Sequence, residues 1–518
     1  MTLSNLLARR AFLQRAALAA AATQLPGRAW SNPALRHDPF ALGIASGDPT
    51  PDGVVLWTRL LPEEPGALQA PLTVRWELAD DAGFRRIVQR GQALALPEWG
   101  HSVHVELQGL AADRWYHYRF QCGNAVSATG RTRTAPAPSA LPARLRAVYA
   151  SCQRWEHGYY AAWHHAAQDA PDLVLFLGDY IYEYAMPHDT QGLARLQSLP
   201  LARTLADYRD RYALHKSDPL LQAAHAACPW AVTWDDHEVQ NDYAGTYGRG
   251  HDAAAFAPQR LAAWQAFYEH MPLRAASLAK GVGALQVYRS LRWGRLADIH
   301  LLDARQFRNW QACRAPGSSS AAAVKPEECP EWGAPQRTFL GTAQEQWLAR
   351  QLAGDTARWR VIAQQTLFSP RHYPSGKRST DSWDGYPAAR ARLLQSLAQH
   401  PQPDTVFLGG DIHQNYVCKV LADAEREDAP VLASEFCGTS ITSRSGTRQA
   451  QADAVVRHNP HILLARSEER GYGLVDITPR RWTTTLRALA DPLRADSGAY
   501  TLARFVVEPG RPGPQRDA

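Results

Sequence analysis

Leu173-Val174-Leu175-Phe176-Leu177-Gly178-Asp179 decides the fold, because five apolar residues in a row lead directly into glycine and an acid. Thr405-Val406-Phe407-Leu408-Gly409-Gly410-Asp411 repeats this pattern far along the chain. A run that is apolar on both faces suits a strand covered by helices on both sides, and residues 159–168 and 344–353 have helical patterns between such strands. The sequence therefore predicts an α/β domain whose acids emerge where strands end and loops begin.

The region before these strands has a different pattern of apolar and turn residues. From about Phe40 to Thr134, short β-like runs alternate with Asp, Gly and Pro turns, which is typical of a small β-sandwich. Residues 115–120 are similar to the strand that carries the tyrosine corner in fibronectin type III domains. We therefore predict an N-terminal fibronectin/Ig-like β-sandwich domain at 38–134, a Pro-rich linker at 135–142 and a catalytic domain at 143–510.

Residues 1–30 have the pattern of a targeting segment. Arg9-Arg10 is followed by Phe12-Leu13, an alanine-rich apolar run at 16–22 and a small-residue region near Ala29. Paired arginines before Phe-Leu resemble a twin-arginine export signal, whose machinery carries chains that have already folded. We expect a periplasmic or extracellular protein; the alternative interpretation is a basic amphipathic first helix.

Composition excludes several classes of protein. The chain has 518 residues, of which 45% are hydrophobic and 20% charged, as in folded soluble proteins with more than one domain. Its formal charge is +6, but four arginines lie in the first 29 residues, where there is no acid. The rest is nearly neutral, so we expect no stable nucleic-acid partner. No apolar run reaches 18 residues, so we expect no transmembrane segment.

The seven cysteines are an odd number, so at least one thiol is not in an intramolecular disulfide. Cys313 and Cys329 flank a Gly/Ser/Ala-rich insertion, and a disulfide that closes this loop is plausible in an oxidising compartment, although sequence alone leaves the connectivity open. Cys152 follows a predicted strand at 145–149 and is a candidate metal ligand. The alternative is a buried cysteine that acts as a small hydrophobic residue.

Asp179 and Tyr182 point to metal chemistry. A carboxylate at a strand end can bridge two cations, and a nearby phenol can bind as a phenolate if a strongly acidic metal lowers its pKa. Phenolate and thiolate together favour Fe(III) over Mg or Ca. A structural Gly-Asp turn is the alternative, but Asp411 is followed by His413, and alternation places both side chains on one side of an extended backbone.

Residues 234–242 concentrate five ionisable groups and one amide in nine positions: Asp235, Asp236, His237, Glu238, Asn241 and Asp242. This density favours a functional site over a core segment. A solvated acidic loop is the alternative interpretation.

Taken in order, these motifs resemble the alkaline phosphatase D (PhoD-like) family of secreted metallophosphoesterases. The resemblance runs from about Phe40 to the C-terminal region and departs from the family pattern at Ala304 and at Cys437-Gly438, neither of which includes a proposed ligand. The matching segments are 151–153, 178–183, 234–238, 302–308, 410–413 and 435–441.

The resemblance implies a four-layer sandwich of two sheets flanked by helices, and a site that holds Fe(III) and Ca(II), with other divalent ions possible at the second position. Asp179 would bridge the metals. The remaining ligands would be Cys152, Tyr182 and His413 toward iron, Asp236 and Asp411 toward the second cation, and Asn241 toward a further calcium. The choice of Asp236 over Asp235 stays open.

Two residues carry over as catalytic groups. His237 would give a proton to the leaving oxygen or a hydrogen bond to the transition state; the alternative is a supporting or core histidine. Arg305 is a candidate clamp for phosphate oxygens, and a surface ion pair with Asp303 is the alternative. The attacking group would be a metal-held hydroxide, without a covalent enzyme intermediate. Trp155 and Tyr180 are expected near the mouth of the pocket.

The resulting hypothesis is an exported hydrolase of phosphate monoesters, diesters or both, acting on small-molecule or polymer esters. One alternative is a secreted binding or adhesion module whose second domain is an inactive metal-bearing scaffold. Another is a phospholipase D or nuclease-like diesterase. The physiological ester and the oligomeric state are left open by the sequence.

Overall fold

The computed structural model describes residues 37–61, 70–186, 191–318 and 320–517. The predicted export signal at 1–30 lies outside the described residues. Among the helices within these ranges, none combines the length and the apolar character that crossing a membrane requires.

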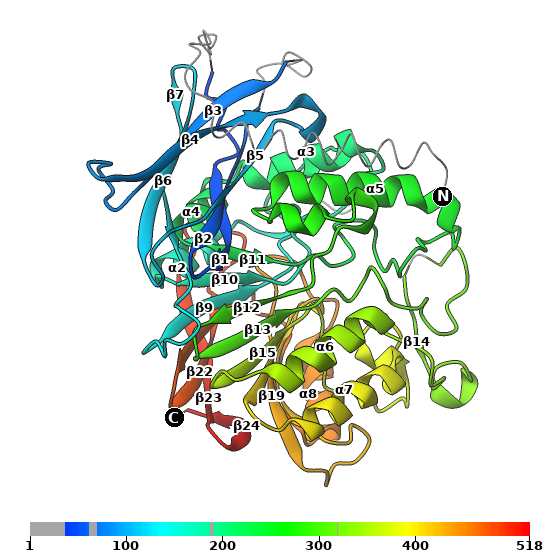
Figure 1. The fold of residues 1–518 in the computed structure, drawn as a ribbon. Helices are drawn as coiled ribbons and strands as arrows, with labels where there is room; N and C mark the ends of the chain where they lie inside the picture. Colours follow the sequence, from blue (N-terminus) through cyan, green and yellow to red (C-terminus); the bar gives the residue numbers. More distant parts are fainter. Residues whose placement is uncertain (1–36, 62–69, 187–190, 319, 518) are drawn as a thin grey trace.

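Two mixed sheets lie face to face at the centre of the molecule (Figure 1). The ten-stranded sheet has the order β24 (Arg511–Arg516), β23 (Ala499–Glu508), β22 (Arg481–Leu489), β21 (Gly471–Thr478), β9 (Leu145–Ala150), β10 (Leu173–Phe176), β11 (Trp230–Val232), β1 (Ile44–Thr50), β2 (Gly53–Arg59), β5 (Ser102–Leu107). The seven-stranded sheet has the order β12 (Arg289–Trp293), β13 (Ala297–Leu301), β15 (Trp359–Ala363), β17 (Asp404–Gly409), β19 (Val431–Cys437), β18 (Asn415–Leu421), β20 (Ile462–Arg466).

Helices cover the outer face of each sheet. The ten-stranded sheet packs against α2 (Ala161–Gln168), α3 (Leu205–Lys216), α4 (Pro219–Ala227) and α5 (Ala253–His270). The seven-stranded sheet packs against α6 (Thr342–Gly354), α7 (Pro387–Gln399) and α8 (Gln449–His458). This arrangement confirms the predicted four-layer sandwich.

Strand β10 shows why an uninterrupted apolar run was needed. Val174 and Phe176 point into the core beneath the helices, whereas Leu173, Leu175 and Leu177 point into the core between the two sheets. All five side chains are at most 2% exposed. Because side chains alternate along a strand, a strand between two cores must be apolar at every position.

Capping residues set the ends of the covering helices. Asp218 accepts hydrogen bonds from the backbone N–H groups of Leu220 (2.9 Å) and Leu221 (3.3 Å), and Pro219 occupies the first turn of α4. Thr204 and Asp207 form a capping box at the start of α3. These caps satisfy backbone donors that the helices leave unpaired.

The N-terminal β-domain shares a sheet with the catalytic domain. Its five-stranded sheet, at the top left of Figure 1, contains β4 (Ile87–Ala95), β3 (Leu72–Ala79), β6 (Trp115–Cys122), β7 (Ala125–Val126) and β8 (Gly130–Arg133). This sheet packs on β1, β2 and β5, which extend the ten-stranded sheet through a parallel pairing of Gly47 with Trp230. The predicted domain bounds are not tested by this arrangement, but strands β1, β2 and β5 of the N-terminal domain continue the ten-stranded sheet of the catalytic domain.

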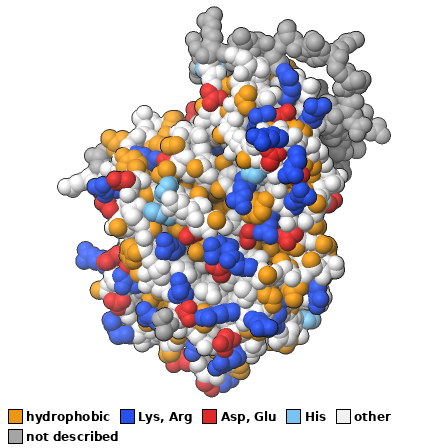
Figure 2. All heavy atoms as spheres, turned by 90° about the vertical axis from the view of Figure 1, so that its left-hand side faces the viewer, with side chains coloured by type: hydrophobic (Ala, Val, Ile, Leu, Met, Phe, Trp, Pro, Cys, Tyr) orange, Lys and Arg blue, Asp and Glu red, His pale blue; other side chains and the backbone are white. Residues whose placement is uncertain are grey.

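Two local features agree with the sequence analysis. The Tyr116 hydroxyl accepts a hydrogen bond from the backbone N–H of Ala111 at 3.0 Å, as a tyrosine corner does. A disulfide joins Cys313 to Cys329, as expected, and the other five cysteines are free and buried. On the face that Figure 2 shows, Lys and Arg side chains alternate with Asp and Glu side chains.

Candidate metal centre and catalytic site

The candidate site forms where strands of both sheets end. Cys152 follows β9, Asp179 follows β10, Asp236 follows β11, and Asp411 and His413 follow β17 of the other sheet. Because β9, β10 and β11 are parallel neighbours, their carboxyl ends meet at one edge. The sandwich then brings the end of β17 to the same place.

Four of these candidate ligands have left-handed backbone conformations. The φ angle is +59° at Cys152, +58° at Asp179, +66° at Asp411 and +54° at His413. Residues other than glycine rarely adopt positive φ, and such strained positions cluster where a side chain must be aimed at a functional site. Four of the candidate ligands are therefore among the residues of the described chain that carry this backbone strain.

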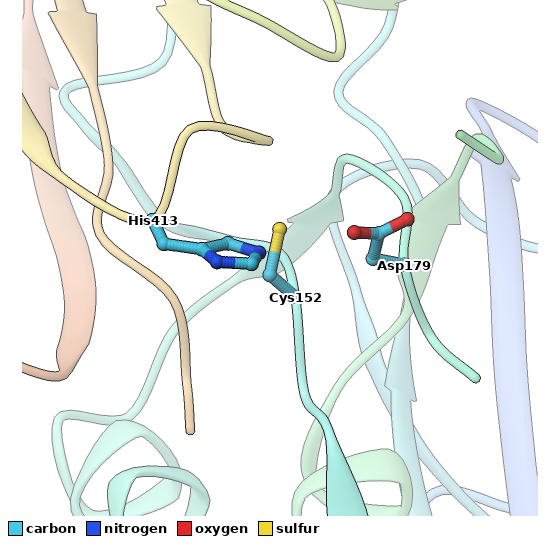
Figure 3. Close-up of side chains that lie close together, drawn as sticks. All are labelled: Cys152, Asp179 and His413. Carbon is cyan, nitrogen blue, oxygen red and sulfur yellow. The ribbon is translucent and has the colours of Figure 1, made fainter. Parts of the chain in front are cut away.

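One group of side chains contains sulfur, oxygen and nitrogen donors. Cys152, Asp179 and His413 each offer an atom within 4.8 Å of the others, and Figure 3 shows the sulfur between the imidazole and the carboxylate. The Tyr182 hydroxyl lies 3.1 Å from Asp179 Oδ2 and 3.2 Å from His413 Nε2. Cys152, Asp179 and Tyr182 are at most 3% exposed. The four residues predicted for the iron side thus converge.

A second group consists of carboxylates alone. Asp179, Asp235, Asp236 and Asp411 offer oxygens within 4.8 Å of one another. Asp179 belongs to both groups, as a bridging ligand must. Within the described part of the chain, the buried Oδ2 atom of Asp235 has no hydrogen-bond partner, so it is available to a cation.

The choice between Asp235 and Asp236 stays open, because both carboxylates reach the group. Asp236 also lies within 4.8 Å of Asp242 and Asp381, and its Oδ2 accepts a hydrogen bond from the Asp242 N–H at 2.6 Å. Asn241 lies in the same loop and its N–H donates to Glu183 at 2.7 Å. Its role as a ligand remains a prediction.

The pKa values fit a site built for cations. Burial raises the pKa of Asp179 well above its usual range, and the carboxylates of Asp236 and Asp411 add to this rise although His237 opposes it. Burial, followed by the charge of Asp179, also raises the pKa of the Cys152 thiol and of the Tyr182 phenol. These shifts disfavour the ionised form of each group in the protein alone, and a bound cation would favour it. The donor set therefore fits a metal centre.

Supporting residues hold the ligands in place. Glu238 accepts hydrogen bonds from the backbone N–H groups of Asp179 (3.0 Å), Tyr180 (2.6 Å) and Asp235 (2.8 Å), which ties the ends of β10 and β11 together. His413 Nδ1 donates to the Arg444 carbonyl at 2.8 Å, so Nε2 keeps its lone pair. Burial lowers the pKa of His413 to about 3, which also favours the neutral ligand form.

His237 is paired with a carboxylate that the sequence analysis gave no role. Its Nδ1 donates to Glu183 Oε2 at 2.7 Å, and Glu183 is 1% exposed. Burial lowers the pKa of His237, but the charges of Glu183, Asp179 and Asp236 outweigh it and raise the pKa well above its usual value. The imidazolium form of His237 is therefore favoured beside these carboxylates. The signal in the sequence was the position of Glu183 directly after Tyr182.

Arg305 lies inside the site rather than on the surface. Its guanidinium donates through Nε to Asp235 and through Nη1 to Asp381 at 2.9 Å, and the residue is 1% exposed. The alternative of a surface ion pair with Asp303 is wrong, because the Asp303 carboxylate accepts the backbone N–H of Arg305 at 3.0 Å instead. Asp381 had no sequence motif that marked it.

The prediction that Tyr180 lies at the pocket mouth is wrong. Tyr180 is fully buried and its hydroxyl contacts His225 Nε2 at 2.8 Å in the helix-covered core. Trp155 is half-buried under the guanidinium of Arg195, 3.5 Å from its ring centre. The aromatic rings beside His237 are those of Tyr182 and Tyr184, with ring centres at 4.2 and 5.8 Å.

Known families and solved structures match both the sequence and the fold of this chain. Residues 147–486 match the family model for PhoD-like phosphatase, and residues 26–136 match that for the PhoD-like phosphatase N-terminal domain. The chain is 42% identical over 487 residues to alkaline phosphatase D of Bacillus subtilis (strain 168). This alignment covers 92% of this chain and 82% of that protein. A solved structure of PhoD superposes with a TM-score of 0.87 at 40% identity, covering 94% of this chain and 93% of the other.

Proposed function

Because the chain belongs to the PhoD-like phosphatase family and is a phosphoester hydrolase, we propose that it is an exported enzyme that hydrolyses phosphate monoesters, diesters or both with metal ions. One observation carries the metal-dependent part of this proposal. Asp179 is shared between a group with sulfur, phenol and imidazole donors and a group of carboxylates. Two different cations with one common ligand suit this arrangement.

The two donor groups differ in the ion they favour. Cys152, Tyr182 and His413 would hold Fe(III), because thiolate and phenolate bind a strongly acidic ion well. Asp236 and Asp411 would hold Ca(II) or another divalent ion, since hard cations prefer oxygen ligands. When bound, the ions activate water and offset the negative charge of the ester.

His237 has the surroundings of a general acid. Glu183 accepts a hydrogen bond from Nδ1, which fixes the ring and favours the imidazolium form of His237. His237 then gives a proton to the leaving oxygen of the ester, or a hydrogen bond to the transition state. We propose a water-derived nucleophile that attacks phosphorus directly, with no covalent enzyme intermediate.

Arg305 is proposed to bind the phosphoryl oxygens. Its guanidinium uses one N–H for Asp235 and others for Asp381, and its Nη2 lies 3.7 Å from Asp411 at the carboxylate group. An arginine offers five N–H donors, so donors remain for a phosphoryl group beside these acids.

Export through the twin-arginine route to the periplasm or beyond is also part of the proposal. It rests on Arg9-Arg10 and the apolar segment that follows. The disulfide between Cys313 and Cys329 supports an oxidising compartment.

Metal analysis with turnover tests the proposed function. The purified protein should contain iron and calcium and hydrolyse 4-nitrophenyl phosphate, bis(4-nitrophenyl) phosphate or both. Asp179→Ala should lose metal and turnover together, whereas Asp428→Ala, at an exposed position, should lose neither. A metal-loaded wild-type protein without turnover would favour the binding-module alternative. Preference for phospholipid or DNA over these esters would favour the alternative of a phospholipase D or nuclease-like diesterase.

A further inference from the structure

Asp381 receives more hydrogen bonds than its unremarkable sequence position suggests. It lies in the loop between β16 (Arg378–Ser379) and the short 3-10 helix η7 (Trp383–Gly385). Its carboxylate contacts Arg305 Nη1 and Nη2, each at 2.9 Å, and accepts from Gln311 Nε2 at 2.9 Å and from Arg308. Its backbone carbonyl accepts a further hydrogen bond from Arg308 Nη1 at 2.7 Å.

The partners of Asp381 are almost fully buried. Arg305, Arg308 and Gln311 are at most 3% exposed, while the Asp381 side chain is 16% exposed. Arg305 and Arg308 lower the pKa of Asp381 far below its usual value although burial raises it, so the carboxylate is charged. Two parallel contacts from a guanidinium to one carboxylate fix the plane of the guanidinium as well as its position.

This fixed plane decides which acids Arg305 faces. Nε is directed to Asp235, and the edge that carries Nη2 lies 3.5 Å from Asp236 Oδ2 and 3.7 Å from Asp411 Oδ1. Without Asp381, the paired contacts that fix this plane would be lost, and the guanidinium would be free to turn toward these three acids, which attract it. The N–H groups of Arg305 would then donate to these acids instead of to the substrate.

We propose that Asp381 is a positioning residue for phosphoryl binding, which holds Arg305 so that its remaining donors stay available to the substrate. Arg308 and Gln311 hold Asp381 in turn. The inference rests on the proposed function, since it assigns the phosphoryl oxygens to Arg305. It adds a residue outside all the motifs that identified the site.

A double-mutant cycle tests the inference. The dissociation constant of inorganic phosphate is measured by calorimetry on metal-loaded wild type, Asp381→Asn, Arg305→Lys and the double variant. Loss of a charged partner should weaken phosphate binding about tenfold in Asp381→Asn. The double variant should bind no more weakly than Arg305→Lys, because Asp381 acts through Arg305. Asp381→Glu keeps the charge and should recover most of the affinity.

Asp384→Asn is the matched control. Asp384 lies three residues further on, is buried and pairs with Arg390 at 2.6 Å. It should lose stability without a change in phosphate affinity. Effects of Asp381→Asn and Arg305→Lys that multiply in the double variant would overturn the inference, as would an equal loss in Asp384→Asn. If circular dichroism shows that Asp381→Asn is unfolded, the cycle is run with Asp381→Ser, and a phosphate affinity equal to that of the wild type in this variant would also overturn the inference.

The proposed function and this inference fail separately. Phosphate binding can be measured whether or not an ester is hydrolysed. A wild-type protein that binds phosphate but hydrolyses no ester would contradict the proposed function and leave the cycle to decide on Asp381.

Discussion

Glu183→Gln isolates the contribution of the carboxylate that holds His237. Glutamine has the same shape and keeps an oxygen for the Asn241 N–H, which donates to Glu183 at 2.7 Å. It removes the charge from the 2.7 Å contact to His237 Nδ1, in a position that is 1% exposed. A buried hydrogen bond to a charged group contributes about 1.5–3 kcal/mol, which corresponds to roughly a 10- to 150-fold fall in kcat.

The leaving group should decide how large this fall is. A general acid matters most for an alkoxide, which needs a proton as it departs, and least for 4-nitrophenolate, which leaves as an anion. We expect the full loss in kcat with alkyl phosphates and a loss of less than about threefold with 4-nitrophenyl phosphate. The measurement is kcat at saturating concentrations of a series of esters whose leaving groups rise in pKa.

His237→Ala provides the internal comparison. Glu183→Gln in the His237→Ala background should cause no further loss, since the carboxylate acts through the imidazole. An equal loss with every leaving group would refute the assignment of His237 as general acid. A further loss in the His237→Ala background would show that Glu183 acts on something else.

Three other perturbations have defined outcomes. Burial lowers the pKa of Lys216 from 10.5 to about 7. Between these pH values the unfolded chain binds more protons than the folded protein, so the free energy of unfolding rises with pH. Urea unfolding of Lys216→Met should show no such rise, and the variant should be more stable than the wild type at pH 7 by up to about 5 kcal/mol. Replacing Cys313 and Cys329 by serine should lower the free energy of unfolding by about 3 kcal/mol in urea titrations, because the disulfide closes a loop across a separation of 16 residues. Cys152→Ser should lower the iron content while calcium and the circular dichroism spectrum stay unchanged, because the thiolate donor is lost from one side of the centre only.

Each of these three outcomes has a contrary result. A slope that survives in Lys216→Met would place the titrating group elsewhere. Unchanged stability without the Cys313–Cys329 disulfide would mean that the loop is already ordered in the unfolded chain. Iron that remains bound in Cys152→Ser would remove sulfur from the proposed ligand set.

The strand-end ligands could be predicted because their positions depend on local patterns. Apolar runs that end at Asp179 and Asp411 identify buried strands, and the ends of parallel strands in one sheet must lie together. The partners Glu183 and Asp381 could not be assigned in the same way. Their contacts depend on the paths of loops, which hydrophobic periodicity does not encode.

The hydrophobic pattern of the sequence also could not predict that strands of the two domains share one sheet. The seven residues of strand β1 have no pattern that distinguishes pairing within its own domain from pairing with β11. Backbone hydrogen bonds form without regard to side-chain identity, so the partner of an edge strand is set by the packing of whole layers.

Strand β9 is completed only by residues that are synthesised long after it. One edge of β9 pairs with β10, while the other pairs with β21, where Leu145 lies opposite Ile477. At about 5–20 residues per second, a ribosome needs roughly 15–65 s to make the intervening chain, during which that edge is an open template for aggregation. The nascent polypeptide therefore exposes this edge until β21 has been made, and the proposed export as a folded protein would have to wait for that strand.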